Sequence, residues 1–150
     1  QTCALPISNL LLALFLALSA GSARAADTAA DLKKLLGTWE GAAVEGDGSR
    51  PGSARARISE LVITPEKITA RDGQGTLIGE GTFILTRDGA VLAIEANGTG
   101  GQTRNKRYLG ILQLDGDTLK WCSGNPGKPR PTQFRSTPPD AFLMVLTRKS

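Results

Sequence analysis

The sequence contains no histidine. Histidine is the commonest general base and metal ligand, and it activates the nucleophile in Ser-His and Cys-His dyads. Its absence therefore excludes these catalytic arrangements and imidazole metal sites together. The carboxylates do not replace it, because they stand beside glycines in predicted turns, where they serve backbone geometry; these are Asp72, Asp88, Asp115 and Asp117. We expect a protein that is not an enzyme, without catalytic residues, metal or cofactor.

Cysteine is almost as scarce, with only Cys3 and Cys122 in the chain. Cys3 lies in a segment that we expect to be absent from the folded domain, so Cys122 has no partner for an internal disulfide. A reactive thiolate needs a cationic or basic neighbour, and Lys120, on the same face of a predicted strand, is a poor base unless it is buried. We favour a packed, small apolar role for Cys122, and a nucleophilic or redox thiol is the alternative.

No run of like charge marks a nucleic-acid site. The chain has 18 basic and 14 acidic residues, a net charge of +4, and the two signs are interspersed. The densest basic cluster, Arg104-Asn105-Lys106-Arg107, favours the solvated start of a strand over an anion site. We therefore expect no nucleic-acid partner.

The most distinctive feature that is present is an apolar run near the N-terminus. Residues 9–20 (NLLLALFLALSA) are uncharged and of signal-peptide length, and Ala23-Arg24-Ala25 behind them has the small-x-small pattern of a cleavage site. We predict a signal peptide over residues 1–25, cleaved after Ala25 or one residue later, and export to the periplasm or the medium. An uncleaved membrane anchor is the alternative, although the run is short for a span. Residues 1–7 (QTCALPI) resemble translated sequencing-adapter DNA, or else form an atypical signal-peptide start.

The domain itself, residues 26–150, is predicted to begin with a short helix and continue as strands. Asp27 to Leu36 places three leucines on one face and ends at Gly37. Alternating segments between Gly- and Pro-rich turns predict strands at 38–46, 60–63, 67–71, 77–86, 91–96, 106–114, 118–122 and 142–148. Between them we predict loops at 46–52 and 123–140, a brief helical turn at 53–57 and a flexible tip at 97–101.

About eight short strands joined mostly by tight turns predict an all-β fold, a small up-and-down antiparallel β-barrel. An open meander would leave two unpaired edges exposed to aggregation, and closure removes both. After signal cleavage we expect no membrane span, and we expect a monomer.

Two stretches resemble a known family. One is Leu36-Gly37-Thr38-Trp39-Glu40, and the other is LGILQLDGDTLKWC at residues 109–122, continued by GKPRPTQF at 127–134 and the apolar end strand at 143–148. They resemble a bacterial family of small exported lipocalin-like domains with no assigned biochemical role. The resemblance implies a lipocalin-like barrel and an extracytoplasmic location, and it carries over no catalytic residues.

The Gly-x-Trp of Gly37 and Trp39 also resembles the entry motif of lipocalins. In that family the tryptophan closes one barrel end, and an arginine from the last strand lies against it; Arg148 is the matching residue here. The resemblance therefore implies that Gly37, Trp39 and Arg148 form a structural lock rather than a binding site. A stacked indole and guanidinium gain about 0.5–2 kcal/mol.

Two functions remain open for such a barrel. The one we favour is binding of a small apolar or amphipathic ligand, with Tyr108, Trp121, Arg130 and Phe134 as its contacts. The alternative is a filled barrel whose outer loops bind an extracytoplasmic protein or the envelope. The same ambiguity applies to the Pro-rich loop at 125–132, which either offers the Arg130 guanidinium to a ligand or straps the barrel with Phe134 beneath it.

The barrel interior distinguishes the two functions. An enclosed apolar cavity of roughly 300 Å³ or more favours a ligand. An interior packed solid by Trp121, Phe83, Leu112 and Met144 favours the interaction module. Small residues are the only sign of free space in the sequence; these are Gly41, Ala42, Ala43 and Gly110.

Overall fold

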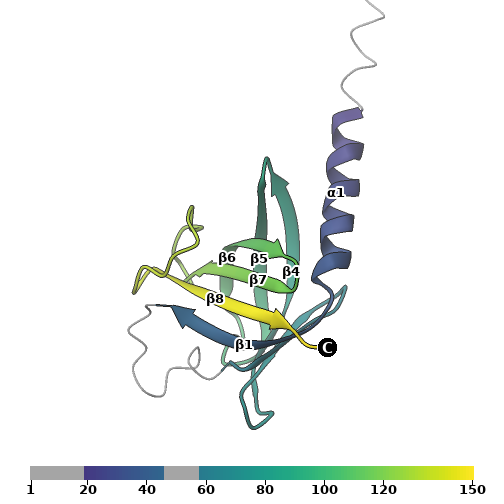
Figure 1. The fold of residues 1–150 in the computed structure, drawn as a ribbon. Coiled ribbons are helices and arrows are strands. Elements are labelled where there is room, and N and C mark those ends of the chain that lie inside the picture. Colours follow the sequence, from purple (N-terminus) through teal and green to yellow (C-terminus); the bar gives the residue numbers. More distant parts are fainter. Residues whose placement is uncertain (1–18, 46–57) are drawn as a thin grey trace, which may run out of the picture.

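A computed structural model describes residues 19–45 and 58–150, with side chains for 27–41 and 58–150 (Figure 1). The predicted loop at 46–52 and helical turn at 53–57 lie outside the described residues, as does most of the predicted signal peptide. The described chain is one helix followed by a barrel of strands.

The helix α1 spans Ser19–Leu35 and is longer than predicted. The predicted start at Asp27 is wrong, because the preceding alanine-rich segment has high helix propensity and continues the helix backwards through Ala25. The predicted end is close to the observed one. Gly37 follows with a φ of 124°, a conformation that residues with a Cβ rarely adopt, and it turns the chain into the first strand.

Eight antiparallel strands then close into a barrel in chain order, which confirms the predicted fold class. They are β1 Gly37–Glu45, β2 Glu60–Ile63, β3 Ile68–Arg71, β4 Leu77–Asp88, β5 Val91–Gly101, β6 Arg107–Asp115, β7 Thr118–Gly124 and β8 Ala141–Arg148. Closure is visible at Trp39, which pairs with Leu61 of β2 on one side and Arg148 of β8 on the other. The barrel therefore has no free sheet edge in its ladder.

The flexible tip predicted at residues 97–101 is wrong, because β5 continues through it to Gly101. Its glycines allow close packing. A Cβ on Gly98 would lie 1.8 Å from the Thr103 carbonyl oxygen, and one on Gly101 would lie 2.5 Å from that of Ile78. Composition indicated flexibility here, whereas the tertiary structure uses the same glycines for close approach of two backbones.

Two apolar clusters lie on the two faces of the sheet. The larger fills much of the barrel interior and includes Leu35 of α1 together with inward side chains of the strands. The smaller lies on the outer face of β6, β7 and β8; it consists of Ile111, Cys122, Ala141 and Leu143, with Phe134 and Val145 packed against it. The segment between β7 and β8 thus covers the outside of the barrel at this point.

Candidate functional site

Trp39 lies at one end of the barrel, where it pairs with Arg148 of β8. Its side chain is fully buried, and its Nε1 donates a hydrogen bond to the Leu35 carbonyl oxygen at 2.9 Å. The Arg148 guanidinium lies over the indole, 4.2 Å from the ring centroid, and donates to the Leu36 carbonyl oxygen at 2.9 Å. The contact that the lipocalin resemblance implies is therefore present. It joins the last strand to the carbonyl groups at the end of α1, where cations are favoured.

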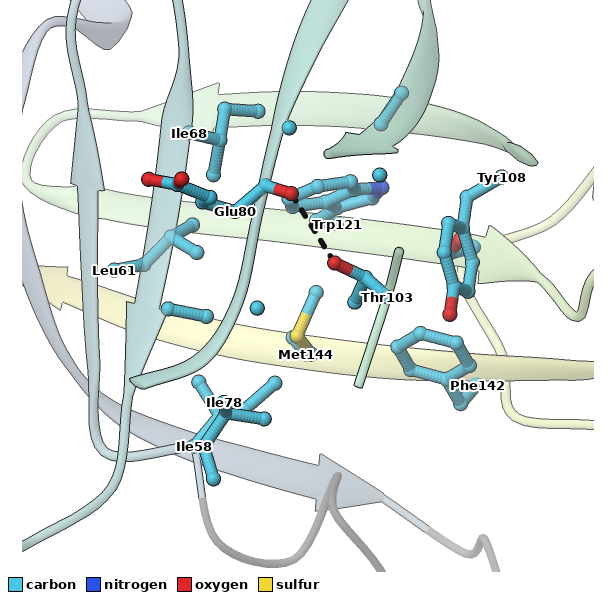
Figure 2. A pocket seen from close by; sticks show the side chains of 16 residues that line it. Ile58, Leu61, Ile68, Ile78, Glu80, Thr103, Tyr108, Trp121, Phe142 and Met144 are labelled. Carbon is cyan, nitrogen blue, oxygen red and sulfur yellow. Dashed lines mark hydrogen bonds between the residues drawn. The ribbon is translucent and has the colours of Figure 1, made fainter. Parts of the chain in front are cut away.

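Away from this end the interior contains a cavity of about 100 Å³ (Figure 2). Its position follows from the strand ends that line it, since Phe142 is near the start of β8 and Ser123 near the end of β7. Its apolar wall consists mainly of Ile58, Leu61, Ile68, Ala70, Ile78, Trp121, Phe142 and Met144. The volume is below the roughly 300 Å³ of a typical ligand pocket. It approaches the roughly 150 Å³ of an apolar cavity known to bind benzene.

The residues that leave this space free differ from those expected. Gly41 and Gly110 do not line the cavity, and the side chains of Ala42 and Ala43 lie outside the described residues. The Trp121 indole fills the space beside Gly110, since a Cβ on Gly110 would lie 2.6 Å from Nε1 of Trp121. Small residues on β3, β4 and β5 line it instead; they are Ala70, Gly79, Gly81, Ala96 and Gly98. A Cβ on any of these three glycines would lie within 2.5 Å of Thr103 or Asn97, so the glycines serve close packing, and the alanines are the small side chains on this wall. The sequence signal was the alternation of glycine and alanine on neighbouring strands.

Few polar groups reach the cavity wall. Ser123 is buried, and its hydroxyl donates to the Gly124 carbonyl oxygen at 3.1 Å. The Thr103 hydroxyl lies 2.8 Å from the Gly100 carbonyl oxygen and 3.2 Å from that of Glu80 (Figure 2). The Glu80 carboxylate forms an ion pair with Lys67 at 3.2 Å. These contacts satisfy the polar groups locally.

Trp121 is the exception on this wall. Its side chain is only 7 % exposed, and its Nε1 is buried with no hydrogen-bond partner among the described residues. Nearly all buried donors in native proteins have a partner. The ring of Trp121 thus contributes to the apolar wall, whereas its Nε1 is enclosed by protein against Gly110.

The predicted ligand contacts are divided between the inside and the outside of the barrel. Tyr108 and Trp121 line the cavity from adjacent strands, and Figure 2 shows the Tyr108 hydroxyl directed toward Phe142. Arg130 and Phe134 do not line it. Arg130 is exposed in a separate surface groove, and Phe134 packs against the outer cluster that contains Cys122. The segment between β7 and β8 therefore covers the outside of the barrel like a strap, with Phe134 packed beneath it.

Cys122 is fully buried in that outer cluster. Its Sγ donates a hydrogen bond to the Arg135 carbonyl oxygen at 3.4 Å, and burial raises the pKa of the thiol above its usual value. A raised pKa lowers the thiolate fraction on which nucleophilic reactivity depends. The environment supports the packed apolar role that we favoured.

Among the side chains that the structure describes, those of residues 27–41 and 58–150, no group of three or more cysteine and carboxylate side chains could hold a metal ion. In the same residues, no helix has both the length and the apolar character needed to cross a membrane. Comparisons with protein-family models, curated proteins and solved structures found no match to the chain. The function must therefore be argued from the barrel and its cavity.

Proposed function

We propose that this protein is an exported, lipocalin-like binding protein that holds a small apolar or amphipathic molecule in its barrel. The observation that carries the proposal is the apolar cavity beside Trp121. A closed barrel is a rigid container, and small barrels of eight strands commonly hold one small ligand.

The apolar wall supports this use of the cavity. Burying apolar surface gains about 25 cal/mol per Å², so an apolar group that entered the cavity would be held by the hydrophobic effect. Ala70 is buried on this wall, where a larger side chain would take up part of the space.

The same volume limits the ligand. A molecule that lies wholly inside has about the size of a benzene ring or less. A longer molecule would insert one end and leave the rest outside. Ile58, Thr103 and Tyr108 line the cavity and are only half-buried, so they mark the side from which a ligand would enter.

A comparison of three chains purified from the same exporting host, the wild type and two variants, tests the proposal. Ala70 is buried and faces the cavity, so Ala70→Leu adds three carbon atoms to its interior. Ala90→Leu adds the same volume at an exposed turn and serves as the matched control. Native mass spectrometry should detect a bound small molecule on the wild type and on Ala90→Leu, and little or none on Ala70→Leu. Equal spectra for all three chains would contradict the proposal.

Export is proposed on the signal-like N-terminal sequence. Sequencing the N-terminus of the protein recovered outside the cytoplasm should give Ala26 or Asp27 as the first residue. Recovery of an uncleaved chain in the membrane fraction would favour the anchor instead.

A further inference from the structure

The wall of the cavity has two sides that differ in chemistry. The strands β2, β3 and β4, with the residue two before β2, supply aliphatic side chains, which are Ile58, Leu61, Ile68, Ala70 and Ile78. The strands β6, β7 and β8 supply aromatic rings and a thioether, which are Tyr108, Trp121, Phe142 and Met144. Figure 2 shows Leu61 and Ile68 on the opposite side of the cavity from Tyr108 and Phe142. A molecule inside therefore meets saturated carbon on one side and aromatic rings with sulfur on the other.

The register of the strands makes the aromatic side a continuous surface. Trp121 of β7 lies directly opposite Met144 of β8 in the ladder. Phe142 stands two residues before Met144 on β8, so both side chains project into the barrel. All three side chains are buried, which holds them in place by packing. They present rings and a thioether, rather than polar atoms, to the space inside.

Polar groups of the wall are bonded or enclosed. The hydroxyl groups of Ser123 and Thr103 both bond to backbone carbonyl oxygens. The Glu80 carboxylate is paired with Lys67, and Nε1 of Trp121 is enclosed by protein. A polar group that left water for this cavity would lose its hydrogen bonds without replacement, which is unfavourable. The enclosed part of the ligand is therefore expected to be hydrocarbon.

Aromatic rings attract one another beyond the burial of their surface. The face of a ring is electron-rich and its edge is electron-poor, so two rings gain energy in edge-to-face or offset arrangements. A thioether sulfur also makes favourable contacts with an aromatic ring. A saturated molecule of the same volume gains only from the burial of its apolar surface. The aromatic side of the wall can thus distinguish an aromatic ring from a saturated one.

We propose that the part of the ligand inside the barrel is an aromatic hydrocarbon ring of about six carbon atoms, held against Trp121, Phe142 and Met144. These three residues then determine specificity, while the aliphatic side contributes burial alone. A polar substituent of the ring lies at the half-buried side of the cavity, near Tyr108. This inference rests on the proposed function, since it names the chemical class of the molecule that the cavity holds.

Two volatile hydrocarbons of similar volume test the inference on the wild-type chain. Benzene is aromatic, cyclopentane is saturated, and neither carries a polar group. Headspace gas chromatography measures the affinity of the protein for each probe, and the same method measures the partition of each probe from water into hexadecane. Dividing each affinity by the partition coefficient removes the difference in hydrophobicity. Burial of apolar surface alone would then give equal corrected affinities.

The corrected affinity of benzene should be roughly fivefold higher than that of cyclopentane, the ratio that one favourable aromatic pair supplies. In Phe142→Leu, which replaces a ring of the wall by aliphatic carbon, this ratio should fall toward one. Phe134→Leu makes the same substitution in the outer cluster, outside the cavity, and should keep the wild-type ratio.

The outcomes that contradict the inference differ from those that contradict the function. If both probes bind the wild type with equal corrected affinity, or cyclopentane binds more tightly, the aromatic preference is wrong and the cavity remains a binding site. A fivefold ratio that persists unchanged in a folded Phe142→Leu chain would also contradict the inference. If neither probe binds up to its solubility limit, both the function and the inference are wrong. The comparison on the wild type decides the question even if Phe142→Leu does not fold.

Discussion

Trp39 and Trp121 show how one residue type serves two purposes in one barrel. Trp39 is enclosed by Leu35, Leu36 and Arg148, and all its polar capacity is used. Trp121 borders a cavity and keeps its N–H unpaired within the described chain. The first arrangement stabilises the fold, and the second places an indole ring on the apolar wall of the cavity.

The lock at Trp39 leads to a stability prediction. Trp39→Ala should lower the free energy of unfolding by about 3–5 kcal/mol, the range for truncation of a large buried aromatic side chain. The loss has two sources, because the variant leaves a cavity and removes the hydrogen bond to Leu35. Urea unfolding followed by circular dichroism measures it. An unchanged unfolding midpoint would show that Trp39 does not close the barrel.

Arg148→Ala provides the graded comparison. It removes the guanidinium from the indole and the hydrogen bond to the Leu36 carbonyl oxygen, but it leaves the Trp39 ring in place. The expected loss is smaller, about 1–2 kcal/mol. Arg148→Lys keeps the charge without the planar guanidinium, so its free energy of unfolding should lie between those of the wild type and Arg148→Ala.

Cys122 carries a prediction on pH. Burial raises the pKa of its thiol above the ordinary value of 9.0, so the stabilising contribution is complete below pH 9 and declines as the pH rises through the folded-state pKa. With Cys3 replaced by serine, alkylation by iodoacetamide at pH 8.5 should be at least about tenfold slower in the folded chain than in urea. Equal rates would show that the thiol is accessible and reactive, against the packed role.

For single residues, the alternation of side chains along the strands predicted which face of the sheet several of them occupy. It placed Tyr108 and Trp121 on adjacent strands facing the interior, and Cys122 on the other face of β7. It could not place Arg130 and Phe134, because a Pro-rich loop has no periodicity that indicates which side of the barrel it covers. Nor could it reveal the unpaired Nε1 of Trp121, which depends on the positions of all neighbouring acceptors.

At the scale of elements, the segment between β7 and β8 is the clearest departure from a binding loop. It is fastened at its base by a hydrogen bond from the Asn125 amide to the Asp140 carbonyl oxygen at 2.8 Å and by an ion pair between Lys128 and Asp140 at 2.7 Å. Farther along, the Ser136 hydroxyl accepts from the Leu143 amide of β8 at 2.9 Å. Phe134 then packs on the outer cluster beneath it. The segment is held against the sheet as a strap.

The strap leads to a paired prediction. Phe134→Ala should destabilise the fold by about 1–3 kcal/mol, because the half-buried ring leaves the apolar outer cluster. It should leave the affinity of the barrel for benzene unchanged. Arg130→Ala, at an exposed position of the same segment, should change neither quantity by a measurable amount. Loss of benzene binding in a folded Phe134→Ala chain would show that Phe134 contributes to the ligand site after all.

The helix α1 is the second element that differs from expectation. It lies beside the β4–β5 hairpin, where Nε of Arg87 donates to the Asp31 carboxylate at 2.8 Å and Leu32 approaches Phe83 and Leu85 (Figure 1). Sequence reasoning found the helix by its leucines and its end by Gly37. Its true start was missed, because alanine-rich sequence continues a helix without a marked boundary.

At the scale of the whole molecule, closure was predictable and cavity volume was not. The number of short strands and the need to remove sheet edges indicate a closed barrel. The volume inside depends on the sum of all inward side chains. Exchanging one small and one large residue between strands changes the cavity without altering the pattern of alternation. The sequence therefore left a filled and a hollow barrel open, and the structure has a cavity of about 100 Å³.

The cavity is most directly tested through Met144, which lines it and is the only methionine of the chain. A ¹³C-labelled methionine methyl group gives one signal from inside the barrel, and a benzene ring bound beside it shifts that signal through its ring current. Titration with benzene should move the Met144 methyl signal to saturation in the wild type and in Ala90→Leu, and not in Ala70→Leu. A Met144 signal that stays fixed in the wild type up to the solubility limit of benzene would show that the barrel is filled, and would contradict a ligand-binding function.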